Sequence, residues 1–303
     1  MATPDASAEL PGLDIEVHNQ QQTPSVIERP AYSSLLDFPK GAKPGTFLHA
    51  IFEHIAFEDP DPAIIATMMS EQLLIHGFEA EWHPVLTTMV NDTINAPLND
   101  NGLTLSALKA GDYRAELEFN LPLGLLKARP LNNLLRQYDP LSKQAGDLIF
   151  QNVQGMLKGF IDLTFTHNGR WYVLDWKSNW LGDTTAAYTQ EAMAKGMIDH
   201  RYDLQYLIYV LALHRMLKSR LPEYDYDTHM GGAFYIFLRG IQPPNTFETP
   251  TDPKDDLATT GDIFTGEAQP HEQTGIYHHR PQRELIEALD RLFQGEAKES
   301  SLC

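Results

Sequence analysis

Apolar residues recur at helical spacing in several stretches of this 303-residue chain. Within residues 45–57, one face of a helix would carry Phe47, Leu48, Ile51, Phe52 and Ile55. The same kind of pattern predicts further helices over residues 61–76, 81–98, 131–138, 185–198, 203–217 and 282–293. The first three helices follow one another closely, so residues 45–110 are expected to form a helical lead-in to the rest of the chain.

Other stretches show the alternation that is typical of β-strands. Over residues 113–121, the side chains of Tyr113, Ala115, Leu117, Phe119 and Leu121 are predicted to share one side of a strand. Residues 157–176 are predicted to form two strands joined at Asn168-Gly169, a dipeptide that strongly favours a tight hairpin turn. Residues 232–238 are apolar enough to form a buried strand.

Two segments interrupt these patterns. Residues 1–44 are rich in Pro, Ser and Gln without a sustained period, which is typical of a linker or extended arm. Residues 248–267 contain six acidic side chains and one lysine, Lys254, and are interpreted as a solvated loop within an acidic segment that precedes the closing helix at 282–293.

The composition narrows the class of protein. With 41 acidic and 23 basic residues the net charge is −18, which argues against a protein that coats DNA by itself with a basic face. Acidic chains can still act on DNA, since carboxylates bind divalent metals and a partner can hold the phosphates. No apolar run predicts a membrane span, residues 1–10 lack the features of a secretory signal, and no P-loop ATPase motif is present. The single cysteine, Cys303, is compatible with a reducing cytoplasm.

The predicted hairpin carries the candidate chemistry. If Asn168 and Gly169 form the turn, the same register sets Asp162 opposite Asp175. Two like charges at opposed positions destabilise a sheet, so a sequence that keeps them beside Lys177 is predicted to bind a cation there. Oxygen ligands of this kind suit Mg²⁺ or Mn²⁺. The alternative from spacing alone is a solvated outer face on which Asp175 and Lys177 form an ordinary surface ion pair.

At these residues the sequence resembles a known family. Gly159-Phe160-Ile161-Asp162 followed by Asp175-Trp176-Lys177 is similar to the G-x-x-D and D-x-K signature of RecB-family nucleases in the PD-(D/E)xK superfamily. The resemblance extends through residues 175–182, 187–190, 200–206 and 237–240, and is strongest between residues 155 and 240. It implies an α/β fold for residues 45–303, with a central mixed sheet flanked by helices, a catalytic core at 111–240 and a helical N-terminal extension.

The resemblance also implies further site residues. It makes His49 a third metal ligand beside Asp162 and Asp175, although from spacing alone a helical histidine paired with Glu53 would be favoured. His54 is the competing histidine, but it does not match the family's motif. Glu116 is implied as an acid near the site, with an exposed strand glutamate as the alternative. The family's Q-x-x-x-Y motif falls on Gln205 and Tyr209, which share a helical face and would bind a phosphate or orient the catalytic lysine.

What the resemblance implies about function is a Mg²⁺-dependent, or Mn²⁺-dependent, exodeoxyribonuclease in the bacterial cytoplasm. It would act on single- and double-stranded DNA with RecC- and RecD-like subunits and a RecB-type helicase region, in the resection of double-strand breaks, in recombinational repair and in the degradation of linear DNA. Lys177 would orient or activate the attacking water, and its place on the polar hairpin face predicts that its removal leaves the core intact. Two alternatives remain: a catalytically silent RecB-like docking module, and a metal-dependent phosphodiesterase that acts on small substrates.

Overall fold

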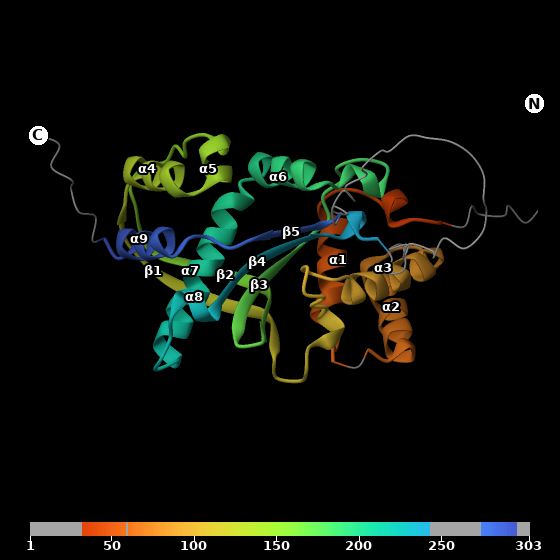
Figure 1. The fold of residues 1–303 in the computed structure, drawn as a ribbon. Helices are drawn as coiled ribbons and strands as arrows, with labels where there is room; N and C mark the ends of the chain where they lie inside the picture. Colours follow the sequence, from red (N-terminus) through yellow and green to blue (C-terminus); the bar gives the residue numbers. More distant parts are fainter. Residues whose placement is uncertain (1–31, 59, 243–273, 296–303) are drawn as a thin grey trace, which may run out of the picture. The chain divides into compact units, whose positions relative to one another are not determined.

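The structure is a computed structural model that describes residues 32–58, 60–242 and 274–295. Its first part contains the helices α1 (Ala42–Glu53), α2 (Pro62–His76) and α3 (His83–Asn95). Strand β1 (Tyr113–Leu126), helices α4 (Ala128–Tyr138) and α5 (Pro140–Ala145), and strands β2 (Val153–His167) and β3 (Arg170–Lys177) follow (Figure 1). The remaining elements are α6 (Gln190–Asp199), α7 (Tyr202–Arg220), α8 (Tyr226–His229), β4 (Met230–Phe237), β5 (Ile276–His279) and α9 (Arg283–Phe293).

The strands form one mixed sheet in the order β1-β2-β3-β4-β5. β3 and β4 are parallel, and the other neighbours are antiparallel. The predicted hairpin register is confirmed from His167, which pairs with Arg170, to Leu163, which pairs with Leu174, but the predicted pairing of Asp162 with Asp175 is not among these pairs. The turn residue Asn168 has a φ of 50° and Gly169 a φ of 76°, as a two-residue hairpin turn with a left-handed backbone requires.

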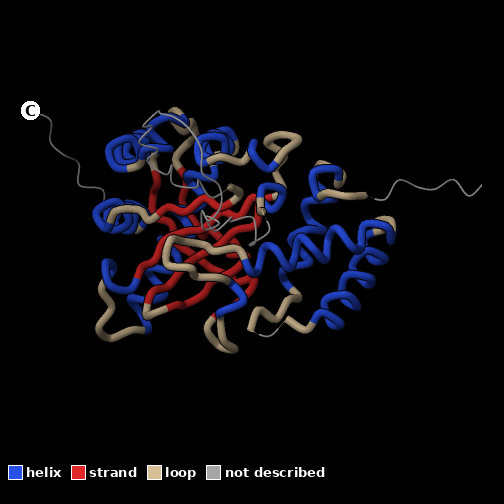
Figure 2. The backbone as a smooth tube through the Cα atoms, turned by 45° about the vertical axis from the view of Figure 1, so that its right-hand side comes forward, coloured by secondary structure: helices blue, strands red, loops and turns tan. Residues whose placement is uncertain are grey.

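Helices cover both faces of the sheet (Figure 2). On one face, buried side chains of α1, α2 and α3 pack in one cluster with Leu163, Leu174 and Trp176 of the hairpin. On the other face, α7 and α9 pack with Val173 and Tyr235 in a second cluster. The expected α/β architecture with a helical N-terminal part is therefore confirmed. No helix within the described ranges is long and apolar enough to cross a membrane.

The predicted alternation along β1 and β2 is wrong at one point. Leu163 belongs to the cluster under α1, whereas Ile161 belongs to the cluster under α7, although strict alternation would place them on one face. On β1, Tyr113 likewise packs against the cluster under α1, whereas Leu117 packs against the cluster under α7. The change of face occurs at Glu116, a non-glycine residue with a left-handed φ of 50° that lies between the pairs Ala115–Leu163 and Leu117–Ile161.

Part of the expected arm at residues 1–44 is folded. Among the described residues, which begin at Tyr32, a short 3₁₀ helix spans Leu35–Asp37, and Phe38 is buried in the core beside Phe47. Residues 1–31 and the acidic loop at 248–267 lie outside the described residues. Helices α5 and α8 and strand β5 were not predicted, because each is only four to six residues long and shows little periodicity.

Candidate active site

The candidate carboxylates and the lysine gather where the hairpin ends. Asp175 and Lys177 lie within the last three residues of β3. Only 2% of the Asp175 surface and 6% of the Lys177 surface are exposed. Lys177 Nζ is 2.5 Å from Asp175 Oδ2. The backbone N–H of Trp176 donates to Asp162 Oδ2 at 2.9 Å, which fixes Asp162 beside the same strand. The alternative of a solvated surface pair is therefore wrong, because both partners are buried.

Burial dominates the electrostatics of Asp175. Desolvation raises the pKa of its carboxyl group, the charge of Lys177 lowers it, and the charge of Asp162 raises it again, with a net increase. A buried carboxylate with a raised pKa is typical of sites that bind a cation or transfer a proton. The geometry therefore holds negative charge where a second cation, in addition to Lys177, would be stabilising.

Helix α1 brings His49 to this point. His49 Nδ1 lies 3.3 Å from Asp162 Oδ2. Burial lowers the pKa of His49, but the hydrogen bond and charge of Asp162 and the charge of Asp175 outweigh that effect and raise it. One turn before His49, a Cβ atom on Gly45 would lie 2.9 Å from Ser178 Oγ, so glycine lets α1 pack closely against the segment that follows Lys177.

Glu116 lies at the kink of β1. Burial and then the charges of Asp162 and Glu53 raise the pKa of its carboxyl group. A left-handed backbone at a non-glycine residue costs on the order of 1–3 kcal/mol and is concentrated at functional sites. The kink thus sets an acid beside Asp162, and this placement favours the site role over an exposed strand glutamate.

Gln205 and Tyr209 form a hydrogen-bonded chain that ends at the lysine. Lys177 Nζ donates to Gln205 Oε1 at 3.0 Å, and Gln205 Nε2 donates to the Tyr209 hydroxyl at 2.9 Å. The hydroxyl of Tyr235 on β4 donates to the same Gln205 Oε1 at 3.1 Å. The Tyr202 ring lies 3.6 Å from Lys177 Nζ. These contacts favour orientation of the lysine as the role of the Gln205–Tyr209 pair.

The residues present fit a divalent metal. The expected set supplies one imidazole and two carboxylates, and Asp175 Oδ2 is a buried oxygen that makes no hydrogen bond in the described structure apart from its ion-pair contact with Lys177. Within residues 32–58, 60–242 and 274–295, however, no group of three His, Cys, Asp or Glu side chains is already arranged to hold a metal. The metal set of His49, Asp162 and Asp175 therefore stays a prediction.

Sequence reasoning gave no role to Arg239, which is 2% exposed and lies just after β4. Its guanidinium donates to the backbone carbonyl oxygens of Leu35 at 2.7 Å, Phe38 at 2.9 Å, Pro39 at 2.7 Å and Ser178 at 3.0 Å. Arg239 thus fastens the segment before α1 to the segment that follows Lys177. The only signal in the sequence was its presence in the family-like stretch 237–240.

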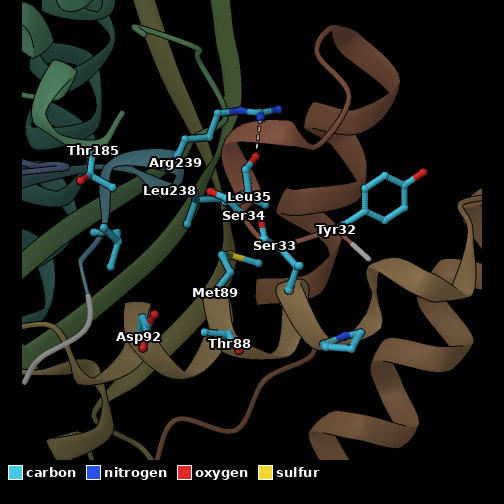
Figure 3. Close-up of a pocket in the computed structure, with 13 residues that line it drawn as sticks. Tyr32, Ser33, Ser34, Leu35, Thr88, Met89, Asp92, Thr185, Leu238 and Arg239 are labelled. Atoms are coloured by element: carbon cyan, nitrogen blue, oxygen red, sulfur yellow. Dashed lines mark hydrogen bonds between the residues drawn. The ribbon is translucent and has the colours of Figure 1, made fainter. Parts of the chain in front are cut away.

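A cavity of about 390 Å³ adjoins Arg239, which reaches from it to the carbonyl oxygen of Leu35 (Figure 3). Its lining includes Ser34, Thr88 and Asp92, but none of His49, Asp162, Asp175 or Lys177. This cavity is thus separate from the candidate chemistry, which lies among buried residues at the strand ends.

Comparison with known proteins agrees with this geometry. Residues 31–300 match the family model of the PD-(D/E)XK nuclease superfamily. The RecBCD enzyme subunit RecB of Escherichia coli strain K12 is 44% identical over 294 residues, which cover 96% of this chain and 22% of that protein. The subunit of the same name from Haemophilus influenzae is 34% identical over 282 residues, 92% of this chain and 21% of the relative.

A more distant RecB subunit, from Mycolicibacterium smegmatis, is 29% identical over 290 residues, 88% of this chain and 25% of the relative. The chain therefore spans about a fifth to a quarter of the length of these curated relatives. Because the family model covers most of the sequence, and because the hairpin, α1 and α7 bring the signature residues together, the family is established. The chain belongs to the PD-(D/E)XK nuclease superfamily.

Proposed function

We propose that the chain is the metal-dependent nuclease part of a RecBCD-type helicase–nuclease and hydrolyses phosphodiester bonds of DNA from strand ends. The observation that carries the proposal is the buried Asp175–Lys177 pair beside Asp162 and His49. A docking module without catalysis has no need to gather two carboxylates, Asp162 and Asp175, at one buried lysine, whereas a nuclease needs both the metal-binding oxygens and the lysine.

His49, Asp162 and Asp175 would hold the metal, with Mg²⁺ as the proposed ion and Mn²⁺ as a substitute. When bound, the metal would polarise a phosphate oxygen and lower the pKa of a bound water. Lys177 has three N–H donors, and two of them point to Asp175 and Gln205 in the described structure. The remaining N–H would donate to the attacking water or to an oxygen of the scissile phosphate, in place of the contact of the ammonium with the Tyr202 ring. Gln205 and Tyr209 keep the ammonium in that position.

Partners would deliver the DNA. The net charge of −18 repels the phosphate backbone, so encounter with free DNA is expected to be slow. A helicase region with RecC- and RecD-like subunits would hold a single strand near Lys177 and so raise its local concentration without any new contact in this chain. Such an assembly would work in the bacterial cytoplasm on the linear DNA of double-strand breaks.

The first test is cleavage by the purified chain. End-labelled linear DNA is incubated with Mg²⁺, with Mn²⁺ and with EDTA, and circular single-stranded DNA serves as a substrate without ends. We expect nucleotides to be released from linear DNA only with a metal, and the Asp175→Asn variant to be inactive. Rapid cutting of the circle would contradict the exonuclease assignment, and no cutting with either metal would favour the docking module.

The second test concerns delivery. The initial rate per nuclease molecule on a linear duplex is measured with and without the helicase and the RecC- and RecD-like subunits, in the presence of ATP. We expect the partners to increase the rate strongly and to reduce its dependence on salt. Equal rates would show that the chain finds its substrate alone, and the delivery model would then be abandoned.

A further inference from the structure

An exposed tryptophan lies shortly after the end of β3. Trp180 lies three residues after Lys177 and is 43% exposed, whereas Trp82 and Trp176 are buried. Isolated exposed apolar residues are common on protein surfaces. The position of Trp180 and the way its loop is held make it unusual.

The loop around Trp180 is fixed on both sides. Before it, Arg239 donates to the Ser178 carbonyl oxygen at 3.0 Å, and the Tyr202 hydroxyl donates to Asn179 Oδ1 at 3.3 Å. After it, the backbone N–H of Leu181 donates to the buried Tyr188 hydroxyl at 3.2 Å. The indole is therefore presented to solvent by a rigid segment, and little conformational entropy would be lost when a ligand binds to it.

A lysine from far away in the sequence completes the arrangement. Lys40 Nζ lies 3.5 Å from the centroid of the Trp180 ring. The residue before Lys40, Pro39, accepts a hydrogen bond from the same Arg239 that holds Ser178. One buried guanidinium thus sets the positions of both the cation and the ring. Because Lys40 lies over one face of the indole, a planar ligand would stack on the opposite face.

We propose that Trp180 and Lys40 form a binding site for one nucleotide of a single DNA strand whose neighbouring phosphodiester reaches Lys177. The base stacks on the open side of the indole, and Lys40 neutralises an adjacent phosphate. Stacking on an aromatic ring combined with a nearby cation is how proteins hold single strands without reading their sequence. The inference rests on the proposed function and adds a substrate contact to it.

Tyr202 connects this site to the chemistry. Its hydroxyl holds Asn179, next to Trp180, and its ring lies 3.6 Å from Lys177 Nζ. A nucleotide on Trp180 would therefore be bound at a fixed position relative to the lysine. Trp180 and Lys40 are positioning residues in this scheme, since neither touches the scissile phosphate.

Equilibrium binding gives the first test. The affinity of the whole chain for a labelled oligothymidylate is measured by fluorescence anisotropy in EDTA, so that no cleavage occurs. We expect Trp180→Ala to weaken binding by about 5- to 100-fold and Trp180→Phe by much less, because phenylalanine keeps a stacking surface. Lys40→Ala should reduce the slope of log affinity against log salt by about 0.7, as expected for one lost phosphate contact on a single strand. Ile149→Ala, at a residue that is 96% exposed, is the control and should bind like the wild type.

Cleavage gives the second test. Oligonucleotides that lack one base at successive positions are cut by the wild type and by Trp180→Ala, and bis(p-nitrophenyl) phosphate serves as a substrate without a base. We expect the wild type to lose rate when the missing base lies at one fixed distance from the cleaved bond, and the variant to have no such sensitive position. Hydrolysis of the small substrate should be equal in both proteins.

The outcomes are distinct. Unchanged affinity in Trp180→Ala, or the same sensitive position in both proteins, would overturn the nucleotide site. A parallel loss of hydrolysis on the small substrate would also overturn it, because Trp180 would then support the catalytic centre itself. If the wild type hydrolyses neither substrate with Mg²⁺ or Mn²⁺, the proposed function fails, and the anisotropy comparison still decides whether Trp180 binds single strands.

Discussion

Two buried cations lie at the ends of neighbouring parallel strands, and they are held in opposite ways. Lys177 ends β3, and Arg239 follows the end of β4, whose Phe237 pairs with Lys177. Lys177 contacts a carboxylate, an amide oxygen and an aromatic ring, all of them side chains. Arg239 donates only to backbone carbonyl oxygens among its described partners.

Under the proposed function, this difference separates a catalytic side chain from a structural one. The planar fork of arginine fits several fixed acceptors at once, so it suits a permanent joint between segments. An ammonium on a flexible stem keeps a donor for a changing partner. Around Lys177 the structure retains unfavourable features, namely the raised pKa of buried Asp175 and the left-handed backbone of Glu116. Proteins tolerate such features mainly where chemistry requires them.

The largest effect is expected from the removal of Lys177. Lys177→Met should reduce the rate of DNA cleavage by at least about 100-fold, since a positioned donor or proton-transfer group typically contributes a factor of this size. Initial rates on labelled single-stranded DNA measure the effect. Lys195→Met, at an exposed lysine paired with Asp199, is the control and should cut normally. Normal cleavage by the Lys177 variant would remove the distinction between the two cations.

The sequence-based expectation that loss of Lys177 leaves stability unchanged is wrong in its premise, because Lys177 is buried rather than on a solvated face. Without its charge the pKa of Asp175 rises further, since Lys177 lowers it in the wild type. A carboxyl group with a raised folded-state pKa stabilises the fold below its unfolded-state pKa, and this contribution is lost as the pH rises through the folded-state pKa. The melting temperature of the variant should therefore lie further below that of the wild type at pH 8 than at pH 5.

Arg239→Lys should instead act on stability. The substitution leaves buried carbonyl oxygens without donors, and a cost of about 3 kcal/mol is expected from such unsatisfied acceptors. For a chain of 303 residues that corresponds to a decrease in melting temperature of roughly 5 °C. Calorimetric or circular-dichroism melting measures it, with Arg136→Lys at an exposed ion pair as the control. A melting temperature like that of the wild type would mean that the hydrogen bonds from Arg239 to the four carbonyl oxygens are not needed for stability.

The sequence predicted what local pattern and covalent order determine. The hairpin register followed from Asn168-Gly169, because a two-residue turn leaves one pairing. The burial of Lys177 and the joint made by Arg239 could not be predicted, since they depend on α7 and on the segment at residues 35–39, far away in the chain. The kink at Glu116 was hidden as well, because a left-handed glutamate contradicts its own backbone preference.

The raised pKa values of Asp175 and His49 can be tested through the pH dependence of metal binding. Mn²⁺ needs a deprotonated Asp175 and a neutral His49, and the pKa values of both groups are raised, that of Asp175 to about 6. Affinity should therefore begin to decrease as the pH falls through the raised pKa of His49, and decrease more steeply below about pH 6, where Asp175 also takes up a proton, by up to about tenfold per pH unit for each proton that must be released. Calorimetric titration at pH 5.5, 6.5 and 7.5 measures it. Asp175→Asn should abolish binding, and unchanged affinity in that variant would contradict a shared site with Asp162.

The smallest expected effect concerns Glu116, whose substitution should raise the melting temperature, whereas most substitutions lower it. Burial and the charges of Asp162 and Glu53 raise the pKa of its carboxyl group, so the ionised form opposes folding at pH 8. Glu116→Gln removes that charge and should raise the melting temperature of the metal-free chain, with the difference disappearing at a pH below the unfolded-state pKa of glutamate. Added Mn²⁺ should stabilise the wild type more than the variant if Glu116 assists metal binding. Glu118→Gln, at the exposed neighbour on β1, is the matched control and should show neither effect. A lower melting temperature in Glu116→Gln at pH 8 would show that Glu116 supports the fold, and the division between a strained catalytic region and a satisfied scaffold would then not extend to β1.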